Sequence, residues 1–134
     1  MKEIQFIELE IVLAIHEMQI AEYGGSDGIR DMGLLESALG KPQNLYAYEP
    51  ASSIFELAAS YAYGISKNHP FIDGNKRAAL VTCDTFLKDN SYEIKAGDEE
   101  TYKTFYLLAA GQVSERSLSR WLELNCKKVK KGKK

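Results

Sequence analysis

Cysteine is scarce in this chain, and long apolar runs are absent. Cys83 and Cys126 are the two cysteines among 134 residues. Two thiols so far apart form neither a disulfide framework nor a CxxC metal site, and reduced thiols are typical of a cytoplasmic protein, which we expect here. Apolar neighbours predict that Cys83 is buried. No apolar run reaches the roughly 18 residues that a membrane-spanning helix needs, so we expect no membrane partner. Residues 1–5 lack the apolar segment of a secretory signal, and we expect none.

The composition is that of an ordinary globular domain. Hydrophobic residues make up 45% of the chain and charged residues 27%, which argues against disorder. We expect a single domain over residues 1–126, followed by a basic tail over 127–134 that contains six lysines and no acid. We expect this tail to be disordered. Without it, 11 basic residues oppose 19 acidic ones, a net charge of about −8. Direct binding to nucleic acid is therefore not expected.

Apolar residues recur with helical spacing along most of the chain. The pattern predicts an all-α fold, a compact bundle of about six helices around a central helix, with at most a short β-hairpin. The expected helices cover about 7–23, 32–39, 53–68, 75–90, 99–110 and 114–124. The helix over 75–90 is apolar on most sides, so we expect it to be the central one. The expected N-caps are Asp31, Ser53, Asp98 and Ser114, and Gly40 is the expected end of the second helix.

Two features outside these patterns stand out. His16 lies on the apolar face of the first helix, where a buried histidine bonded to a backbone carbonyl is the expected role. A catalytic or metal-binding role for His16 would need a second ligand, and none is near it in the sequence. The segment from Pro42 to Pro50 is the longest one that lacks helical periodicity.

Nine consecutive residues, from His69 to Arg77, concentrate groups that suit a phosphate site. They include an imidazole, a carboxylate, an amide, an ammonium and a guanidinium. Gly74 permits a close backbone approach, and the start of the next helix attracts an anion. Lys76 and Arg77 are charged donors for phosphate, Asp73 suits Mg²⁺, and His69 suits a general base. Capping alone explains Asp, Gly and Asn in such a loop, but not the whole set.

The motif His-Pro-Phe-Ile-Asp-Gly-Asn-Lys-Arg over 69–77 resembles the signature of the Fic/Doc family, in its Doc (death-on-curing) branch. Further likeness covers nearly the whole chain outside 127–134, at His16, Tyr23-Gly24-Gly25, Gly28–Asp31 and Leu34–Ala38. The resemblance implies a transferase that uses ATP and Mg²⁺. The catalytic residues are then expected to be His69, Asp73, Lys76 and Arg77. The residues expected to bind the nucleotide are Gly74, Asn75, Lys76, Arg77 and Lys67.

Each of these residues has an expected role. His69 removes the proton from the target hydroxyl, and Asp73 holds Mg²⁺. The turn at 74–75 and Lys76 cradle the phosphate chain, while Arg77 stabilises charge on the transferred group. Lys67, two residues before the loop, either reaches the phosphates as well or is a solvated lysine at a helix end.

Two positions depart from the Fic branch. Fic proteins usually have glycine where this chain has Lys76, and a second arginine where it has Leu80. The Lys76 side chain fills space that would hold the α and β phosphates for adenylyl transfer. The Doc resemblance implies that ATP binds reversed and offers its γ-phosphoryl group, so the expected reaction is protein phosphorylation.

The resemblance also implies the toxin of a type II toxin–antitoxin system. Its target would be a threonine of elongation factor Tu, so that translation stalls, and the C-terminal helix of a small antitoxin would fill an apolar groove. No complete copy of the self-inhibitory Ser/Thr-x-x-x-Glu-Gly/Asn motif of Fic proteins occurs, because Leu57 follows Glu56. The segment from Pro42 to Pro50 lies where Fic relatives place a target-docking flap, or it is a plain connector.

Two other functions stay open. A Fic-type adenylyltransferase that tolerates Lys76 would transfer AMP, and α-labelled against γ-labelled ATP separates it from a kinase. A non-catalytic binding module would keep the loop for stability alone. The intact set of His69, Asp73, Asn75 and Arg77 argues against that alternative.

Overall fold

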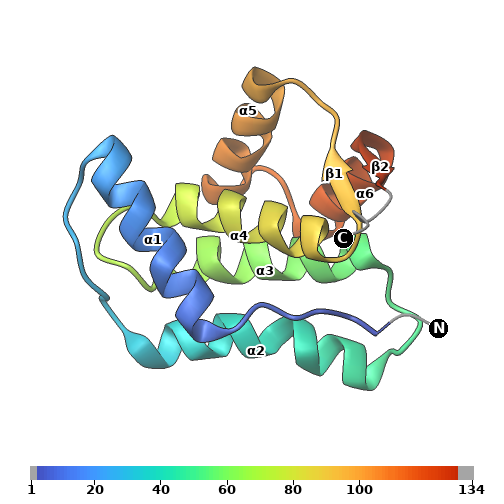
Figure 1. Ribbon diagram of the computed structural model, residues 1–134, viewed down its shortest axis with the longest axis horizontal. Helices are drawn as coiled ribbons and strands as arrows, with labels where there is room; N and C mark the ends of the chain where they lie inside the picture. Colours follow the sequence, from blue (N-terminus) through green and yellow to red (C-terminus); the bar gives the residue numbers. More distant parts are fainter. Residues whose placement is uncertain (1–2, 130–134) are drawn as a thin grey trace, which may run out of the picture.

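The computed structural model describes residues 3–129, which form six helices and one two-stranded antiparallel sheet (Figure 1). The elements in chain order are α1 (Leu9–Tyr23), α2 (Met32–Tyr48), α3 (Ile54–Asn68), α4 (Asn75–Asp89), β1 (Tyr92–Ile94), α5 (Asp98–Ala109), α6 (Glu115–Asn125) and β2 (Cys126–Lys128). The predicted all-α bundle is confirmed, but the two short strands are separated by α5 and α6 in the chain, so they pair as distant segments and not as the short β-hairpin considered from the sequence. Among the described residues, no helix is long and apolar enough to cross a membrane.

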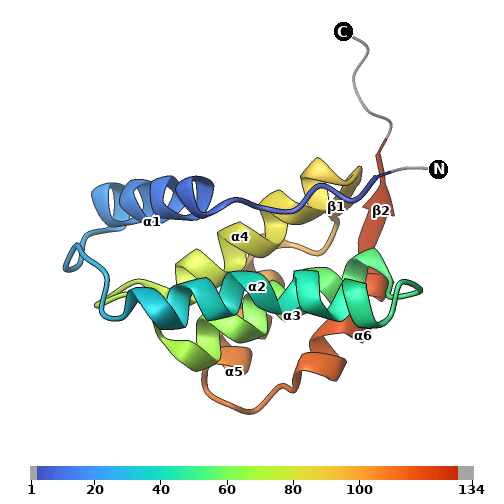
Figure 2. The same ribbon diagram turned by 90° about the horizontal axis from the view of Figure 1, so that it is seen from below.

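Helices α3 and α4 share the centre of the bundle. Figures 1 and 2 show them packed along each other, with α2 on one side of α3 and α1 crossing α4. Helix α3 also contacts α5 and α6, and its residues 57–62 are all buried. The predicted central helix, α4, is buried on the face that includes Cys83, and burial raises the pKa of that thiol. Small side chains allow α3 to be enclosed more fully than α4, since α2 approaches it closely where Gly64 meets Ala38.

Helix α2 continues to Tyr48, so the predicted end at Gly40 is wrong. Pro42 lies inside the helix, where proline lacks the N–H for the helical hydrogen bond and costs about 3 kcal/mol. Burial of Leu35, Leu39 and Pro42 on one helical face offsets this cost. Most of the segment from Pro42 to Pro50, predicted as a flap or a connector, is therefore a packed helix.

Local helix starts follow the sequence closely. Asp31, Ser53 and Ser114 each accept a hydrogen bond from a backbone N–H of the first helical turn, which confirms three predicted N-caps. The fourth is wrong by one residue, because α5 begins at Asp98 and Gly97 is its N-cap. The polar oxygen and the exposed N–H groups lie within one turn, so the sequence is sufficient to find such caps.

The pairing of β1 with β2 corrects the predicted boundary of the basic tail. Tyr92 lies opposite Lys128, and Glu93 lies opposite Lys127, so these two lysines belong to the folded unit. Strand pairing uses backbone groups, which is why the lysine composition did not reveal it. Residues 130–134 lie outside the described residues, and the predicted disorder there stays a prediction.

Candidate active site

The loop between α3 and α4 carries the predicted catalytic motif. His69 is the C-cap of α3 and adopts the left-handed conformation, with φ 53° and ψ 54°, which is uncommon for a residue other than glycine. Gly74 is the N-cap of α4 and also has a positive φ, of 79°. Backbone contacts from elsewhere in the chain must hold His69 in this conformation, because its own preference does not.

Arg30 supplies those contacts at the end of α3. Its Nε donates to the carbonyl of His69 at 2.7 Å, and its Nη2 donates to the carbonyl of Asn68 at 2.8 Å. The backbone N–H groups of Arg30 and Asp31 donate to the carbonyl of Pro70 at 2.7 and 3.0 Å. Carbonyls that the helix leaves without donors are thus satisfied. Sequence reasoning assigned Arg30 no role in the site, although it lies in the Gly28–Asp31 segment that resembles the family.

His16 supports the loop from α1. Its Nε2 lies 2.8 Å from the carbonyl oxygen of Asp73, and its ring stacks on Phe71 with centroids 3.8 Å apart and planes 6° apart. A carbonyl only accepts, so Nε2 carries the proton and donates. The side chain is 3% exposed. The predicted role of His16, a buried histidine bonded to a backbone carbonyl, is confirmed.

The carboxylate of Asp73 is oriented by backbone donors. The N–H of Gly74 donates to its Oδ1 at 2.9 Å, and the N–H of Ser26 donates to its Oδ2 at 3.2 Å. The segment before Ser26 runs so close that a Cβ at Gly25 would lie 2.8 Å from Oδ2. The φ of Gly25 is 115°, a second reason for glycine at this position.

Asn75 connects the loop to the imidazole of His69. Its Oδ1 accepts from the N–H of Phe71 at 2.9 Å, and its Nδ2 donates to the carbonyl of Phe71 at 2.9 Å. The same Nδ2 lies 3.1 Å from Nδ1 of His69. An amide nitrogen only donates, so Nδ1 accepts and the neutral imidazole carries its proton on Nε2. Asn75 is 4% exposed, and its side chain is fully engaged in the protein.

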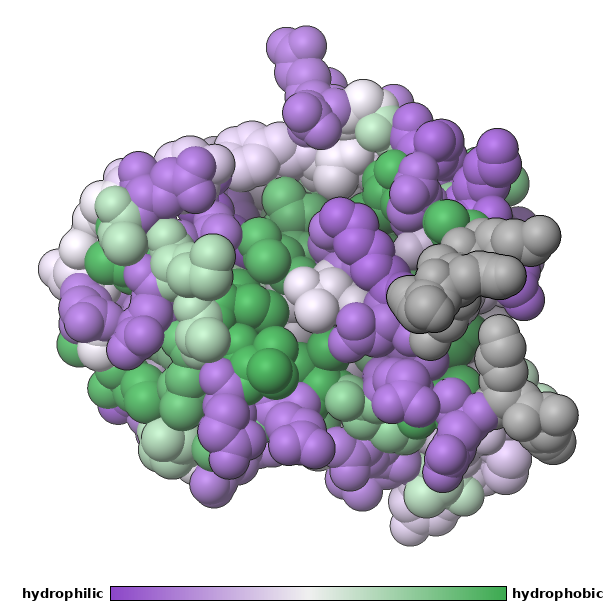
Figure 3. Space-filling model, viewed as in Figure 1, coloured by the Kyte–Doolittle hydropathy of each residue, from purple (hydrophilic) through white to green (hydrophobic). Residues whose placement is uncertain are grey.

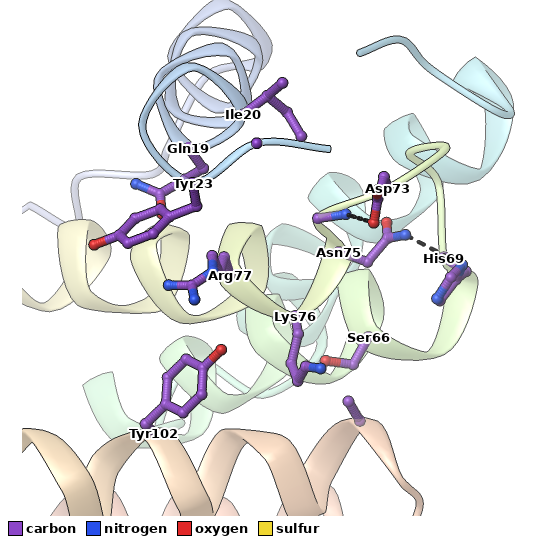
Figure 4. A pocket seen from close by; sticks show the side chains of 13 residues that line it. Gln19, Ile20, Tyr23, Ser66, His69, Asp73, Asn75, Lys76, Arg77 and Tyr102 are labelled. Carbon is purple, nitrogen blue, oxygen red and sulfur yellow. Dashed lines mark hydrogen bonds between the residues drawn. The ribbon is translucent and has the colours of Figure 1, made fainter. Parts of the chain in front are cut away.

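A cavity of about 350 Å³ opens beside this loop (Figure 4). Of the predicted site residues, six line it: His69, Asp73, Gly74, Asn75, Lys76 and Arg77. Lys67 is exposed on α3 and does not line the cavity, so its predicted nucleotide contact has no support here. Side chains that sequence reasoning missed complete the wall from α1, α3 and α5, namely Gln19, Ile20, Tyr23, Ser66 and Tyr102.

Aromatic rings, rather than carboxylates, accompany the two cations. Nζ of Lys76 lies 5.0 Å from the ring centre of Tyr106. Cζ of Arg77 lies 3.8 Å from the ring centre of Tyr23 and 5.1 Å from that of Tyr102. No ion pair found within residues 3–129 involves either cation. Their charges are not neutralised locally, which leaves them able to bind an anion. In the sequence, the available indication of these contacts was that Tyr102 and Tyr106 lie four residues apart on one helix, α5, whose first turn is acidic.

The N-terminus of α4 adds further positive potential. No side chain caps this 15-residue helix. The first backbone N–H groups of the helix, beside Lys76 and Arg77, are therefore free to donate hydrogen bonds. Such a helix end, with two cations in the following turn, suits phosphate oxygens.

The carboxylate of Asp73 fits a magnesium ion that also binds phosphate. Within residues 3–129, no three His, Cys, Asp or Glu side chains converge as a metal site. Mg²⁺ commonly uses one or two carboxylates together with substrate phosphates and water. Asp73 is exposed, and each of its oxygens accepts one backbone hydrogen bond, which leaves lone pairs for a cation.

A groove of about 500 Å³ adjoins the cavity; its lining includes the apolar Leu80 and Val81 and also the acidic Asp98 and Glu99. It lies among α1, α4 and α5, and shares Gln19, Tyr23, Arg77 and Tyr102 with the cavity wall. Figure 3 shows hydrophobic and hydrophilic side chains interspersed on the face of the molecule that carries α1, α4 and α5. Leu80, which stands where Fic proteins have a second arginine, lines the groove and not the cavity.

The helical bundle and the loop at the free N-terminus of α4 are the features by which this protein can be classified. Similarity to known proteins gives the family. The chain belongs to the Fic/Doc family: the family's sequence pattern matches residues 6–87. It is 34% identical to "Protein kinase doc" of Escherichia phage P1 over 113 residues, 84% of this chain and 89% of that protein. It is 35% identical to "Toxin Doc" of Mycolicibacterium smegmatis over 75 residues, 55% of this chain and 58% of that protein. The Doc resemblance predicted from the sequence is confirmed.

Proposed function

We propose that this protein is a toxin of a type II toxin–antitoxin pair and that it transfers the γ-phosphoryl group of ATP to a hydroxyl of a translation factor. The observation that carries the proposal is one cavity at the free N-terminus of α4, lined by His69 together with Lys76 and Arg77, two cations that form no ion pair within residues 3–129. The names of the two relatives, a protein kinase and a toxin, point the same way. By family resemblance the target is a threonine of elongation factor Tu, which places the reaction in the cytoplasm.

The phosphate chain binds at the start of α4. The backbone N–H groups of this turn and the side chains of Lys76 and Arg77 donate to the phosphate oxygens. The Asn75 side chain is occupied by Phe71 and His69, so Asn75 contributes its backbone N–H instead. Asp73 would hold Mg²⁺, which would neutralise part of the phosphate charge.

His69 acts as the general base. The oxygen of the target hydroxyl attacks the γ-phosphorus, its proton passes to His69, and the bond from the γ-phosphorus to the β–γ bridging oxygen breaks as ADP leaves. The two cations stabilise the charge that develops on the transferred and leaving oxygens.

The general-base role of His69 requires a change of tautomer, because the hydrogen bond from Asn75 places the proton on Nε2. The ring accepts a proton through Nε2 only in the other tautomer, with the proton on Nδ1, which breaks the hydrogen bond from Asn75. His69 is exposed, so its two nitrogens exchange protons through solvent. Because Asn75 is buried, leaving one of its amide N–H groups without a partner costs about 1 to 3 kcal/mol, roughly 5- to 150-fold. A general base typically contributes about 10²–10⁴-fold, so the upper part of that range exceeds this cost.

The position of Lys76 favours phosphoryl transfer over adenylyl transfer. Its ammonium reaches across the cavity wall toward Tyr106 on α5, which leaves a cation where the family's adenylyltransferases have none. Leu80 supplies no further phosphate contact, because it faces the groove.

Labelled ATP tests this function directly. Purified protein is incubated with elongation factor Tu, Mg²⁺ and either γ-labelled or α-labelled ATP, with the His69→Ala variant as a control. We expect label from γ-labelled ATP alone, and a loss of about 10²–10⁴-fold in the variant. Label from α-labelled ATP would assign the adenylyltransferase alternative, and no label with any translation factor would favour the binding module.

The groove that Leu80 and Val81 line is the proposed site for the helix of an antitoxin. An amphipathic helix fills such a groove with residues at i, i+3, i+4 and i+7. Because the groove shares Tyr23, Arg77 and Tyr102 with the cavity, a helix bound there would contact the same residues that line the nucleotide site. The Leu80→Glu variant should weaken antitoxin binding at least tenfold while kinase activity remains, as measured by titration calorimetry and transfer assays. Unchanged affinity would place the antitoxin elsewhere.

A further inference from the structure

Arg77 lies between the faces of two tyrosines that come from different helices. Tyr23 is the last residue of α1, and Tyr102 belongs to α5. The ring centres are 3.8 Å and 5.1 Å from Cζ of Arg77, and Figure 4 shows the guanidinium between the two rings. The tyrosines are 54% and 39% exposed. Because both rings are substantially exposed, the burial of apolar surface explains only part of why they lie against Arg77.

Stacking differs from an ion pair in what it leaves available. A carboxylate would neutralise the charge of Arg77 and occupy several of its N–H donors. An aromatic face attracts the guanidinium through its π electrons, while the five N–H donors, which lie in the guanidinium plane, stay free. The two rings thus restrict the side chain without consuming its charge or its donors.

We propose that Tyr23 and Tyr102 are positioning residues that hold Arg77 in the orientation in which it meets the phosphoryl group. The phosphate ligand rests on the proposed function, whereas the stack itself does not. An arginine held in advance loses less side-chain entropy when the anion binds. Lys76 provides an internal comparison, since within residues 3–129 one ring, that of Tyr106, lies near its ammonium.

Paired substitutions separate the aromatic face from the rest of each side chain. Tyr23→Phe and Tyr102→Phe keep the face, whereas Tyr23→Leu and Tyr102→Leu remove it. The side-chain N–H resonance of Arg77, assigned by its absence in Arg77→Met, reports ring currents in NMR spectra without any substrate. We expect the phenylalanine variants to retain its shift and each leucine variant to move it toward the value of a free arginine. Tyr48→Leu, an exposed tyrosine outside the cavity, should leave it unmoved.

The functional consequence is measured with ATP and Mg²⁺. We expect each leucine variant to lower kcat for phosphoryl transfer about 2- to 5-fold, as one exposed cation–π contact implies, and each phenylalanine variant to stay within twofold of the parent. In an Arg77→Met background the leucine changes should have no further effect. A structural role alone would lower the unfolding midpoint and would act equally in both backgrounds.

The outcomes are distinct. An unmoved Arg77 resonance in both leucine variants overturns the inference, because the stack would then be absent in solution. A moved resonance with unchanged kcat overturns the positioning role. If the parent itself transfers no phosphate, the proposed function fails, and ATP affinity measured by calorimetry replaces kcat. A 2- to 5-fold weaker affinity in the leucine variants then supports the inference, and an unchanged affinity overturns it.

Discussion

Nδ2 of Asn75 lies 3.1 Å from Nδ1 of His69, so a buried amide determines the tautomer of the proposed general base. Phe71 fixes the amide orientation, because its N–H donates to Oδ1 and its carbonyl accepts from Nδ2. Turning the amide over would break both bonds and leave two buried groups unpaired. The tautomer of His69 therefore depends on the side chain at position 75.

The Asn75→Asp variant should reverse this tautomer. A carboxylate accepts where the amide donated, so Nδ1 of His69 would carry the proton. Nitrogen-15 NMR spectra at neutral pH distinguish the two forms, and we expect Nε2–H in the parent and Nδ1–H in the variant. His16, the other histidine of the chain, donates through Nε2 to the carbonyl of Asp73 and serves as an internal reference. Nδ1–H at His69 in the parent would contradict the assignment.

Arg30 should control activity through the conformation of His69. Arg30→Met removes both side-chain donors to the end of α3, and we expect phosphoryl transfer to fall at least tenfold as His69 leaves its left-handed conformation. Arg30→Lys keeps one donor and should retain more activity. Transfer rates, with circular dichroism to confirm the fold, test this order. If both variants transferred phosphate as fast as the parent, the backbone contacts to Pro70 would be sufficient to hold His69.

We expect Lys76 to decide between the two transfer reactions. Lys76→Gly removes a positive charge from the proposed binding position of the γ-phosphoryl group, so we expect weaker phosphorylation and a trace of adenylyl transfer. Adding Leu80→Arg should raise that trace, although Leu80 lines the groove and the new arginine must reach past Arg77. Mass spectrometry of the target distinguishes the adducts. An adenylyl adduct from the parent would overturn the kinase assignment while leaving the roles of His69 and Asp73 intact.

The burial of the Tyr61 hydroxyl predicts that the protein loses stability at alkaline pH. Its buried hydroxyl accepts from the N–H of Ile7 at 2.9 Å, and burial raises its pKa to about 12. The raised pKa means that the folded state keeps a proton that the unfolded chain releases near pH 10. This contribution is therefore present below pH 10 and is lost as pH rises toward 12.

The Tyr61→Phe variant tests that contribution. At pH 7 we expect the free energy of unfolding to fall by about 1 to 3 kcal/mol, because the N–H of Ile7 is left buried without a partner. Between pH 10 and 12 the difference between variant and parent should shrink. Urea unfolding at pH 7 and at pH 11 measures both effects. A difference that does not change with pH would contradict the assigned titration.

Much of the site could be predicted because it is contiguous. The residues from His69 to Arg77 lie in one loop and the helix turn that follows it, and their expected roles follow from residue type and from the helix that begins at Asn75. Lys67 shows the limit of proximity in sequence, since it is close to His69 along the chain but does not line the cavity.

The sequence by itself determined whatever depends on neighbouring residues: most helices, the caps at Asp31, Ser53 and Ser114, and the order of groups in the loop. Tertiary structure decided whatever depends on a partner distant in the chain. Burial against α3 lets α2 continue past Pro42, and backbone pairing with β1 places Lys127 and Lys128 in a strand. Packing also brought Tyr23 and Tyr102 onto Arg77 from helices far apart in the chain. Local propensities are weak, about 1 kcal/mol per residue or less for most residues, so packing and long-range contacts override them wherever the two disagree.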